Sequence, residues 1–210
     1  MSAKAAKLLL DADAVSKLAY WELLAEVPSL FEVDWNACAT LESVHHRARK
    51  AASGARDKLF PTRKDGAYAV EHLKQMLPLP EPSDRIFKLQ EIPQLDAGEA
   101  ILMAVAADQN ALVVSGDKRA MVAIGSHVRT SGSTDFDQRC ICLEQILLML
   151  LRSHGIEWLR RKICPRRGFD KAIDIIFGSQ CDAHAEQVEQ GLKSYINSLL
   201  EGGRPAVRCG

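Results

Sequence analysis

The chain has 210 residues, of which 47% are hydrophobic and 26% are charged. These proportions are typical of a folded globular protein and exclude an intrinsically disordered chain. Its 27 basic residues are balanced by 27 acidic ones, which excludes a uniformly basic, nucleic-acid-coating surface and leaves local patches to decide which partners are attracted.

Membrane insertion and secretion are not indicated. No stretch reaches the ~18 unbroken apolar residues that cross a bilayer, and residues 141–151 are interrupted by Glu144 and Gln145. The N-terminus has only three leucines before a charge, too few for the apolar core of a signal peptide. We therefore expect a cytoplasmic protein with no membrane partner. Its six cysteines show no Cys-x-x-Cys pair, and we expect free, mostly buried thiols.

The first third of the chain predicts one strand and three helices. Residues 7–10 are a short, mostly apolar run followed directly by Asp11, as in a buried strand. Residues 15–27 have helical apolar spacing and are stopped by a proline. Further helices are expected over 35–52 and 67–77, before a proline-rich loop over 78–82.

The middle of the chain alternates helices and strands. A helix is expected over 95–109, a buried strand over 111–115, a short helix over 118–124, a strand over 139–143 and an apolar helix over 144–153. Strands separated by helices favour a parallel sheet covered on both faces. The sequence therefore predicts a three-layer α/β fold.

Beyond about residue 154 the pattern is helical only. Two helices are expected, over 168–177 and 182–200. About 55 residues with few apolar anchors are marginal as an independent domain. We therefore expect a domain over residues 1–153 and a C-terminal helical extension over 154–210 that packs on it.

Acidic side chains follow two of the predicted strands. Asp11 ends the first strand, with Asp13 two residues on, and Asp117 follows the strand over 111–115. In a parallel sheet the strand C-termini share one edge, where ligand sites form. Asp96 and Glu99 open the helix before the Asp117 strand and also suit an N-cap and its capping box. A protein keeps converging carboxylates, which repel one another, when a cation neutralises them or when the groups share protons, and oxygen ligands suit Mg²⁺ or Mn²⁺.

Four segments together resemble the PIN-domain nucleases, a family that includes VapC-like toxin ribonucleases. The resemblance covers residues 7 to about 145 and places one family acid in each segment: Leu8-Leu9-Leu10-Asp11-Ala12-Asp13, Ala39-Thr40-Leu41-Glu42, Leu95-Asp96-Ala97-Gly98-Glu99-Ala100 and Val113-Val114-Ser115-Gly116-Asp117-Lys118. Two positions depart from the family pattern. Asp13 stands where Asn or Ser is frequent, and Glu99 replaces the commoner Asp.

The resemblance implies a PIN-like fold and RNA cleavage that depends on Mg²⁺ or Mn²⁺. The site residues it implies are Asp11, Glu42, Glu99 and Asp117, as catalytic residues and metal ligands, with Asp13 and Asp96 as additional candidate ligands. A metal-bound water would attack the phosphodiester without a covalent intermediate. The resemblance further implies a toxin neutralised by an antitoxin protein, and we also expect a homo-oligomer.

A basic run lies in the C-terminal extension. Residues 152–171 carry a net charge of +5, whereas residues 172–202 carry −4. Lysines and arginines can bind RNA phosphates. We therefore expect RNA contacts from Arg160, Arg161, Lys162, Arg166 and Arg167, and the alternative is a solvated loop or one paired with the acidic helix that follows.

Three other functions are weighed against the nuclease. A non-catalytic PIN-like module would use the same fold to bind RNA or protein. A flavodoxin-like or receiver domain also gathers acids at strand ends, but the order of acids fits it poorly. Glu42 and His45 have the Glu-x-x-His spacing of a di-iron helix, which occurs here once where a bundle needs it twice. The metal-dependent nuclease remains the preferred interpretation.

Overall fold

Four short parallel strands form the central sheet of the computed structural model, which describes residues 5–208. The strands are β1 (Leu8–Leu10), β2 (Cys38–Thr40), β3 (Leu112–Ser115) and β4 (Cys140–Cys142), in the order β2-β1-β3-β4. Leu9 pairs with Ala39 on one side and Val113 on the other. Nearly every strand residue is buried, as expected of a sheet covered on both faces.

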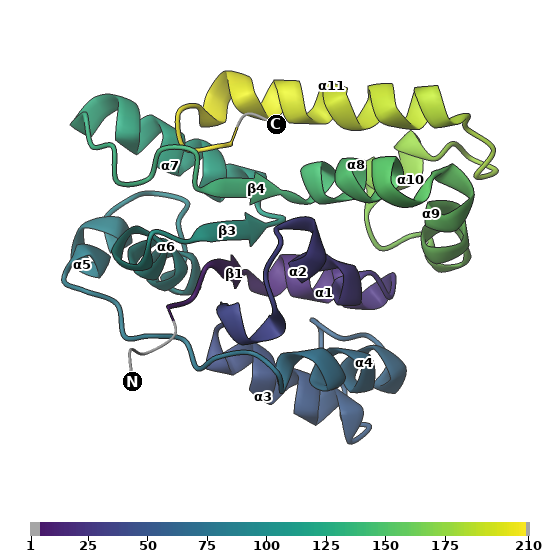
Figure 1. Ribbon diagram of the computed structural model, residues 1–210, viewed down its shortest axis with the longest axis horizontal. Coiled ribbons are helices and arrows are strands. Elements are labelled where there is room, and N and C mark those ends of the chain that lie inside the picture. The colour runs from purple at the N-terminus through teal and green to yellow at the C-terminus, as the bar shows by residue number, and fades with distance from the viewer. Residues whose placement is uncertain (1–4, 209–210) are drawn as a thin grey trace.

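Helices connect the strands and flank the sheet (Figure 1). The predicted α/β fold with a parallel sheet between helical layers is therefore confirmed. The helices before β4 are α1 (Ala12–Tyr20), α2 (Val27–Leu30), α3 (Glu42–Ala52), α4 (Arg63–Leu73), α5 (Arg85–Gln90), α6 (Ala97–Gln109) and α7 (Lys118–Ser131). After β4 come α8 (Leu143–His154), α9 (Ile156–Ile163), α10 (Lys171–Ile176) and α11 (Ala185–Gly203). Single 3-10 turns occupy Leu24–Glu26, Trp35–Ala37 and Cys164–Arg166.

Strand β2 lies inside the segment predicted as one helix over 35–52, and that prediction is wrong at its start. Cys38–Thr40 is too short to show an alternating pattern, and its apolar residues fit helical spacing equally well. Residues 38–40 are extended because their backbone pairs with that of β1. Thr40 Oγ1 also donates to the carbonyl of Leu10 at 2.6 Å. The correction places Glu42 at the first residue of α3.

The C-terminal extension lies against α7, α8 and β4. Helix α11 runs along the top of the molecule beside α7 and α8 (Figure 1). A Cβ added to Gly125 would stand 2.3 Å from the carbonyl oxygen of Gly203, so α7 and α11 meet backbone to backbone. The chain then runs beside β4, where the backbone N of Cys140 donates to Ala206 at 3.0 Å. The extension has α9, α10 and α11, one helix more than predicted.

A disulfide joins Cys164 to Cys181 across the extension. The expectation of free thiols is therefore wrong for this pair, whose Cα atoms lie 6.0 Å apart although 17 residues separate them in sequence. Among the described residues, Cys38, Cys140 and Cys142 are free and buried, as predicted. Over the same residues, no helix combines the length and apolarity that crossing a membrane requires.

Candidate functional site

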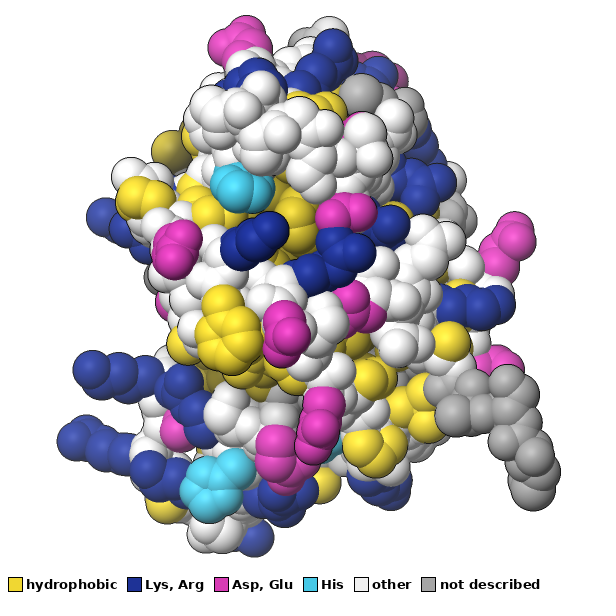
Figure 2. Space-filling view, turned by 90° about the vertical axis from the view of Figure 1, so that its left-hand side faces the viewer, with side chains coloured by type: hydrophobic (Ala, Val, Ile, Leu, Met, Phe, Trp, Pro, Cys, Tyr) yellow, Lys and Arg dark blue, Asp and Glu magenta, His cyan; other side chains and the backbone are white. Residues whose placement is uncertain are grey.

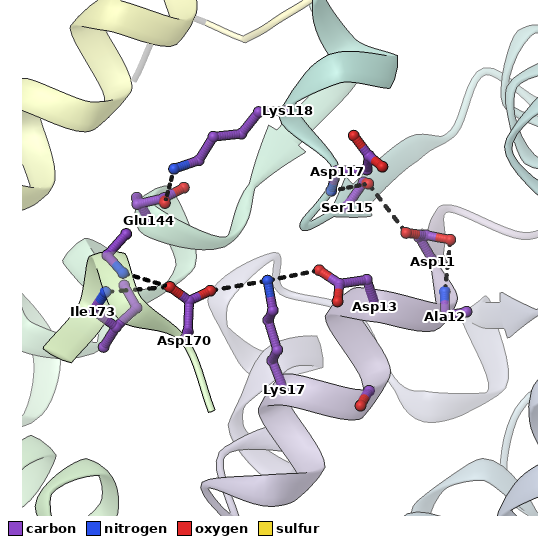
Figure 3. Close-up of polar contacts among 12 residues, drawn as sticks. Asp11, Ala12, Asp13, Lys17, Ser115, Asp117, Lys118, Glu144, Asp170 and Ile173 are labelled. Carbon is purple, nitrogen blue, oxygen red and sulfur yellow. Dashed lines mark hydrogen bonds and ion pairs between the residues drawn. The ribbon is translucent and has the colours of Figure 1, made fainter. Parts of the chain in front are cut away.

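Asp11 lies at the carboxyl end of β1 and caps the N-terminus of α1. One carboxylate oxygen accepts from the backbone N of Ala12 at 2.6 Å, and the other accepts from Ser115 Oγ at 3.2 Å (Figure 3). The residue is buried, with 6% of its surface exposed. Burial raises the pKa of Asp11 to about 6, against the lowering effect of these two hydrogen bonds. Asp13 and Asp96 raise it further by repulsion.

Glu99 lies in the first turn of α6 and shares a capping box with Asp96. The backbone N of Glu99 donates to Asp96 at 2.8 Å, and the backbone N of Asp96 donates to Glu99 at 2.8 Å. Burial raises the pKa of Glu99 to about 7, and repulsion from Asp96, Asp11 and Asp117 adds to the shift. These carboxylates therefore belong to one electrostatic group, although they come from different elements.

A narrow cavity of about 20 Å³ joins Asp11, Glu99 and Ser115. Its remaining walls are almost all apolar: Leu102, Met103, Val113, Ala120, Met121, Ile124 and Cys140. Apolar walls explain why ionising either carboxyl is costly. Within residues 5–208, no lysine, arginine or histidine forms an ion pair with Asp11 or Glu99. The pair is therefore buried, mutually repelling and uncompensated.

Asp117 follows β3 and caps α7, so its environment differs. It accepts from the backbone N of Arg119 at 2.8 Å and of Ala120 at 3.2 Å, and the Arg119 guanidinium lies 3.3 Å away. Burial acts to raise the pKa of Asp117, but these hydrogen bonds and the arginine charge hold it below its usual value. Its backbone N donates to Ser115 Oγ at 3.0 Å, which links it to Asp11 through one hydroxyl.

Asp13 takes part in an ion-pair chain rather than facing Asp11 alone. Lys17 lies 2.8 Å from Asp13 and 2.9 Å from Asp170, so it bridges α1 and the extension (Figure 3). Burial acts to lower the pKa of Lys17, yet the two carboxylates hold it above its usual value. The Asp13 carboxylate lies where a Cβ of Gly116 would stand, 2.0 Å from that position. A side chain at position 116 would therefore force the Asp13 carboxylate, and with it the ion pair to Lys17, to move.

A pocket of about 440 Å³ opens beside Asp117. It mixes charges of both signs, and its lining includes Lys17, Lys118, Arg119, Glu144 and Asp170. Glu144 is buried and is neutralised by Lys118 at 2.6 Å. The pocket adjoins the acidic group and is large enough for a phosphate with its sugar or base.

Glu42 stands apart from the other predicted acids. It opens α3 next to the end of β2, but its side chain is 81% exposed and pairs with Arg49 of the same helix at 2.8 Å. The hydrogen bond from Arg49 lowers the pKa of Glu42. The carboxylates that raise the pKa of Glu99 do not include it. The structure thus brings the backbone of Glu42 to the correct edge of the sheet but directs its side chain outward.

The expected four-acid ligand set is not assembled. Within the described part of the chain, no three His, Cys, Asp or Glu side chains stand together as a metal site requires. Asp11, Glu99 and Asp117 still offer the hard oxygen donors that Mg²⁺ and Mn²⁺ prefer, and their charges couple. All three residues fit a divalent cation in donor type, and Asp11 and Glu99 also fit it in their uncompensated charge.

The basic run of the extension is engaged inside the molecule. Arg166 pairs at 2.7 Å with Asp65, whose side chain is fully buried, and it lies over the ring of Tyr20. Arg160 pairs with Glu157, Arg167 with Asp174, and Lys162 lies 3.9 Å from Glu22. Arg161 alone of the five is exposed. RNA contacts from these residues would therefore compete with the ion pairs that they form within the protein.

Three residues of the site escaped the sequence analysis. Ser115 links Asp11 to Asp117, and the Val-Val-Ser end of β3 held a signal for it, because a hydroxyl directly precedes the Gly-Asp pair. Lys17 lies four residues after Asp13, which predicts an ion pair on one helix face. Asp170 had no signal, because 153 residues separate it from Lys17.

Comparison with known proteins adds no name to this site. No family model, curated protein or solved structure matches the chain.

Proposed function

We propose that the chain is an endoribonuclease that hydrolyses phosphodiester bonds with the help of Mg²⁺ or Mn²⁺ bound by Asp11, Glu99 and Asp117. The observation that carries the proposal is the uncompensated pair of buried carboxyls, Asp11 and Glu99, at the carboxyl edge of the parallel sheet. A protein that keeps two such groups at neutral pH keeps a repulsion that a bound cation relieves.

The chain's own groups prepare this centre for a cation. Ala12 N and Ser115 Oγ fix the carboxylate of Asp11, and Asp96 N fixes that of Glu99. When bound, the cation makes a coordinated water more acidic and neutralises charge that develops on the phosphate. One of the carboxylates orients the attacking water. The neighbouring pocket contains Lys17, Lys118 and Arg119, each of which is paired with an acid, so a phosphate of the RNA would compete with these carboxylates for them.

Glu42, Asp13 and Asp96 have smaller roles in this proposal. Glu42 can join the centre only by leaving Arg49. Asp13 is committed to Lys17 and Asp96 to the cap of α6, so we assign them to shaping the site. An antitoxin partner accompanies the proposal through the family resemblance alone, and self-association and a cytoplasmic location remain expectations from the sequence.

One observation favours a second candidate, a non-catalytic module with the same fold. Glu42 and Asp117 are both paired with arginines, which leaves two carboxyls unpaired where the family pattern has four. Such a module would bind RNA or protein without cleaving it.

A cleavage assay separates the two candidates. Single-stranded RNA carrying a fluorophore and a quencher is incubated with wild type in Mg²⁺, Mn²⁺ or EDTA. We expect cleavage only with metal, a loss of about 100-fold or more in Asp11→Asn, and no loss in the control Asp84→Asn, an exposed acid on the loop before α5. RNA that is bound but left intact by wild type in both metals would favour the module.

A further inference from the structure

The hairpin formed by α3 and α4 concentrates the positive charge of the chain. Residues 47–64 contain seven basic residues and one acid, a net charge of +6. Because the whole chain is neutral, the rest carries 20 basic and 26 acidic residues, a net of −6. The basic residues are Arg47, Arg49, Lys50, Arg56, Lys58, Arg63 and Lys64. This segment is therefore the surface most attractive to a polyanion.

The hairpin presents these side chains on a firm support. Helices α3 and α4 pack closely, because a Cβ at Gly66 would stand 2.6 Å from the backbone N of Ala52. Lys and Arg side chains project from the lower end of the molecule in Figure 2, the end at which α3 and α4 lie in Figure 1. The single acid, Asp57, has a side chain only 5% exposed and is held by Arg47 at 2.9 Å. It therefore does little to weaken the positive surface.

Four of the basic residues have no acidic partner within residues 5–208. Lys50, Arg56, Lys58 and Arg63 are exposed and form no ion pair there, although Arg63 donates to the backbone oxygen of Ala52 at 3.0 Å. In the extension, by contrast, Arg160, Arg166 and Arg167 pair with acids, and their side chains are 22%, 21% and 31% exposed. A phosphate would meet several neighbouring free cations on the hairpin, whereas on the basic run of the extension Arg160, Arg166 and Arg167 are occupied and Arg161 is free.

The hairpin also starts at the candidate site. Helix α3 begins two residues after β2, whose last residue, Thr40, pairs with Leu10 immediately before Asp11. Its 11 residues extend about 16 Å from that edge of the sheet toward the loop that carries Arg56 and Lys58. A single-stranded RNA bound along this surface would therefore have one end near the acidic group.

We propose that the α3–α4 hairpin binds the sugar-phosphate backbone of single-stranded RNA and leads it to the acidic group, a role that the sequence analysis assigned to residues 160–167. The choice of RNA rests on the proposed function. The recognition itself rests on charge, and it predicts binding that is tolerant of sequence and sensitive to salt.

The test compares two variants matched in charge and residue type. Lys50→Gln/Arg56→Gln/Lys58→Gln removes three unpaired cations from the hairpin. Lys88→Gln/Lys171→Gln/Arg204→Gln removes one arginine and two lysines that are exposed and unpaired within the described residues elsewhere. Binding to a fluorescent single-stranded RNA is followed by polarisation in EDTA, so that no cleavage occurs and the result is independent of catalysis. Circular dichroism checks that both variants fold.

We expect the hairpin variant to bind roughly 10- to 100-fold more weakly at 0.1 M salt, and the slope of log K against log salt to become shallower by about 2, since each phosphate contact of a single strand contributes about 0.7. The matched variant should bind like wild type. Equal losses in both variants, or no loss in the hairpin variant, would overturn the proposal. So would wild type that binds polyglutamate as tightly as RNA, because the surface would then fit an acidic protein. Hairpin-dependent binding without metal-dependent cleavage would refute the proposed function alone.

Discussion

Replacing Asp11 by asparagine should stabilise the metal-free protein, and the gain should grow with pH. The pKa of Asp11 rises from an ordinary value of 3.8 to about 6 on folding, so the folded state holds a proton that the unfolded state has released. Stability is therefore lost as pH rises through this interval and stays lost above it. At about 1.4 kcal/mol per pH unit, the ionised carboxylate costs the fold about 3 kcal/mol.

Asparagine removes this cost and keeps the local structure. Its side-chain oxygen can accept from Ala12 N, its amide can donate to Ser115 Oγ, and it is a good N-cap for α1. We expect urea unfolding in EDTA to give the same free energy for Asp11→Asn and wild type near pH 4. By pH 8 the variant should be more stable by about 2–3 kcal/mol.

Asp170→Asn is the matched control with the opposite sign. Burial acts to raise the pKa of Asp170, but Lys17 and the cap of α10 hold it below its usual value. Its carboxylate therefore adds stability at neutral pH, which is lost as pH falls, and the variant should be less stable than wild type at pH 8. An Asp11→Asn protein that is less stable than wild type at pH 8, or whose difference from wild type does not change with pH, would refute the account of an uncompensated carboxyl.

Three further predictions concern the cap of α7 and the C-terminal extension. Asp117→Asn should bring no gain in metal-free stability, because its pKa is lowered and its carboxylate caps α7; a gain like that of Asp11→Asn would contradict this. Arg166→Met should lower the free energy of unfolding by about 2 kcal/mol or more, since it leaves the buried Asp65 unpaired, and a change under about 0.5 kcal/mol would argue against a structural role. Deleting residues 155–210 should expose α7 and α8 and give an insoluble or molten product; a soluble fragment with a cooperative thermal transition would show that the extension is dispensable.

The layered fold could be predicted from the sequence because β1 and β3 are continuous apolar runs between helical patterns. It failed at β2, where three residues owe their extended form to pairing with β1. It also placed Asp11 and Asp117 at one edge of the sheet, since parallel strands end together, whereas Glu99 was added by the family resemblance.

The sequence could not predict the direction in which individual side chains point. A helix-opening glutamate such as Glu42 can turn toward the sheet or toward a basic residue on its own helix, and Arg49 decides between them. The sequence of residues 160–167 does not indicate whether its charges are free or paired. Asp65 lies beside Arg166 only in the folded chain. Long-range ion pairs thus changed the interpretation of several charged residues.

The most direct test of the proposed centre is its binding of Mn²⁺, followed by the electron paramagnetic resonance signal of the free ion. At pH 7.5 we predict at least one Mn²⁺ bound per chain by wild type and by Asp84→Asn, and loss of that binding in Asp11→Asn/Glu99→Gln. Binding by wild type should also weaken toward pH 5.5, because protons compete for the two carboxyls whose pKa values are raised. A wild-type protein that leaves the free Mn²⁺ signal unchanged, or a double variant that binds the ion as wild type does, would contradict the assignment of these acids to a metal centre.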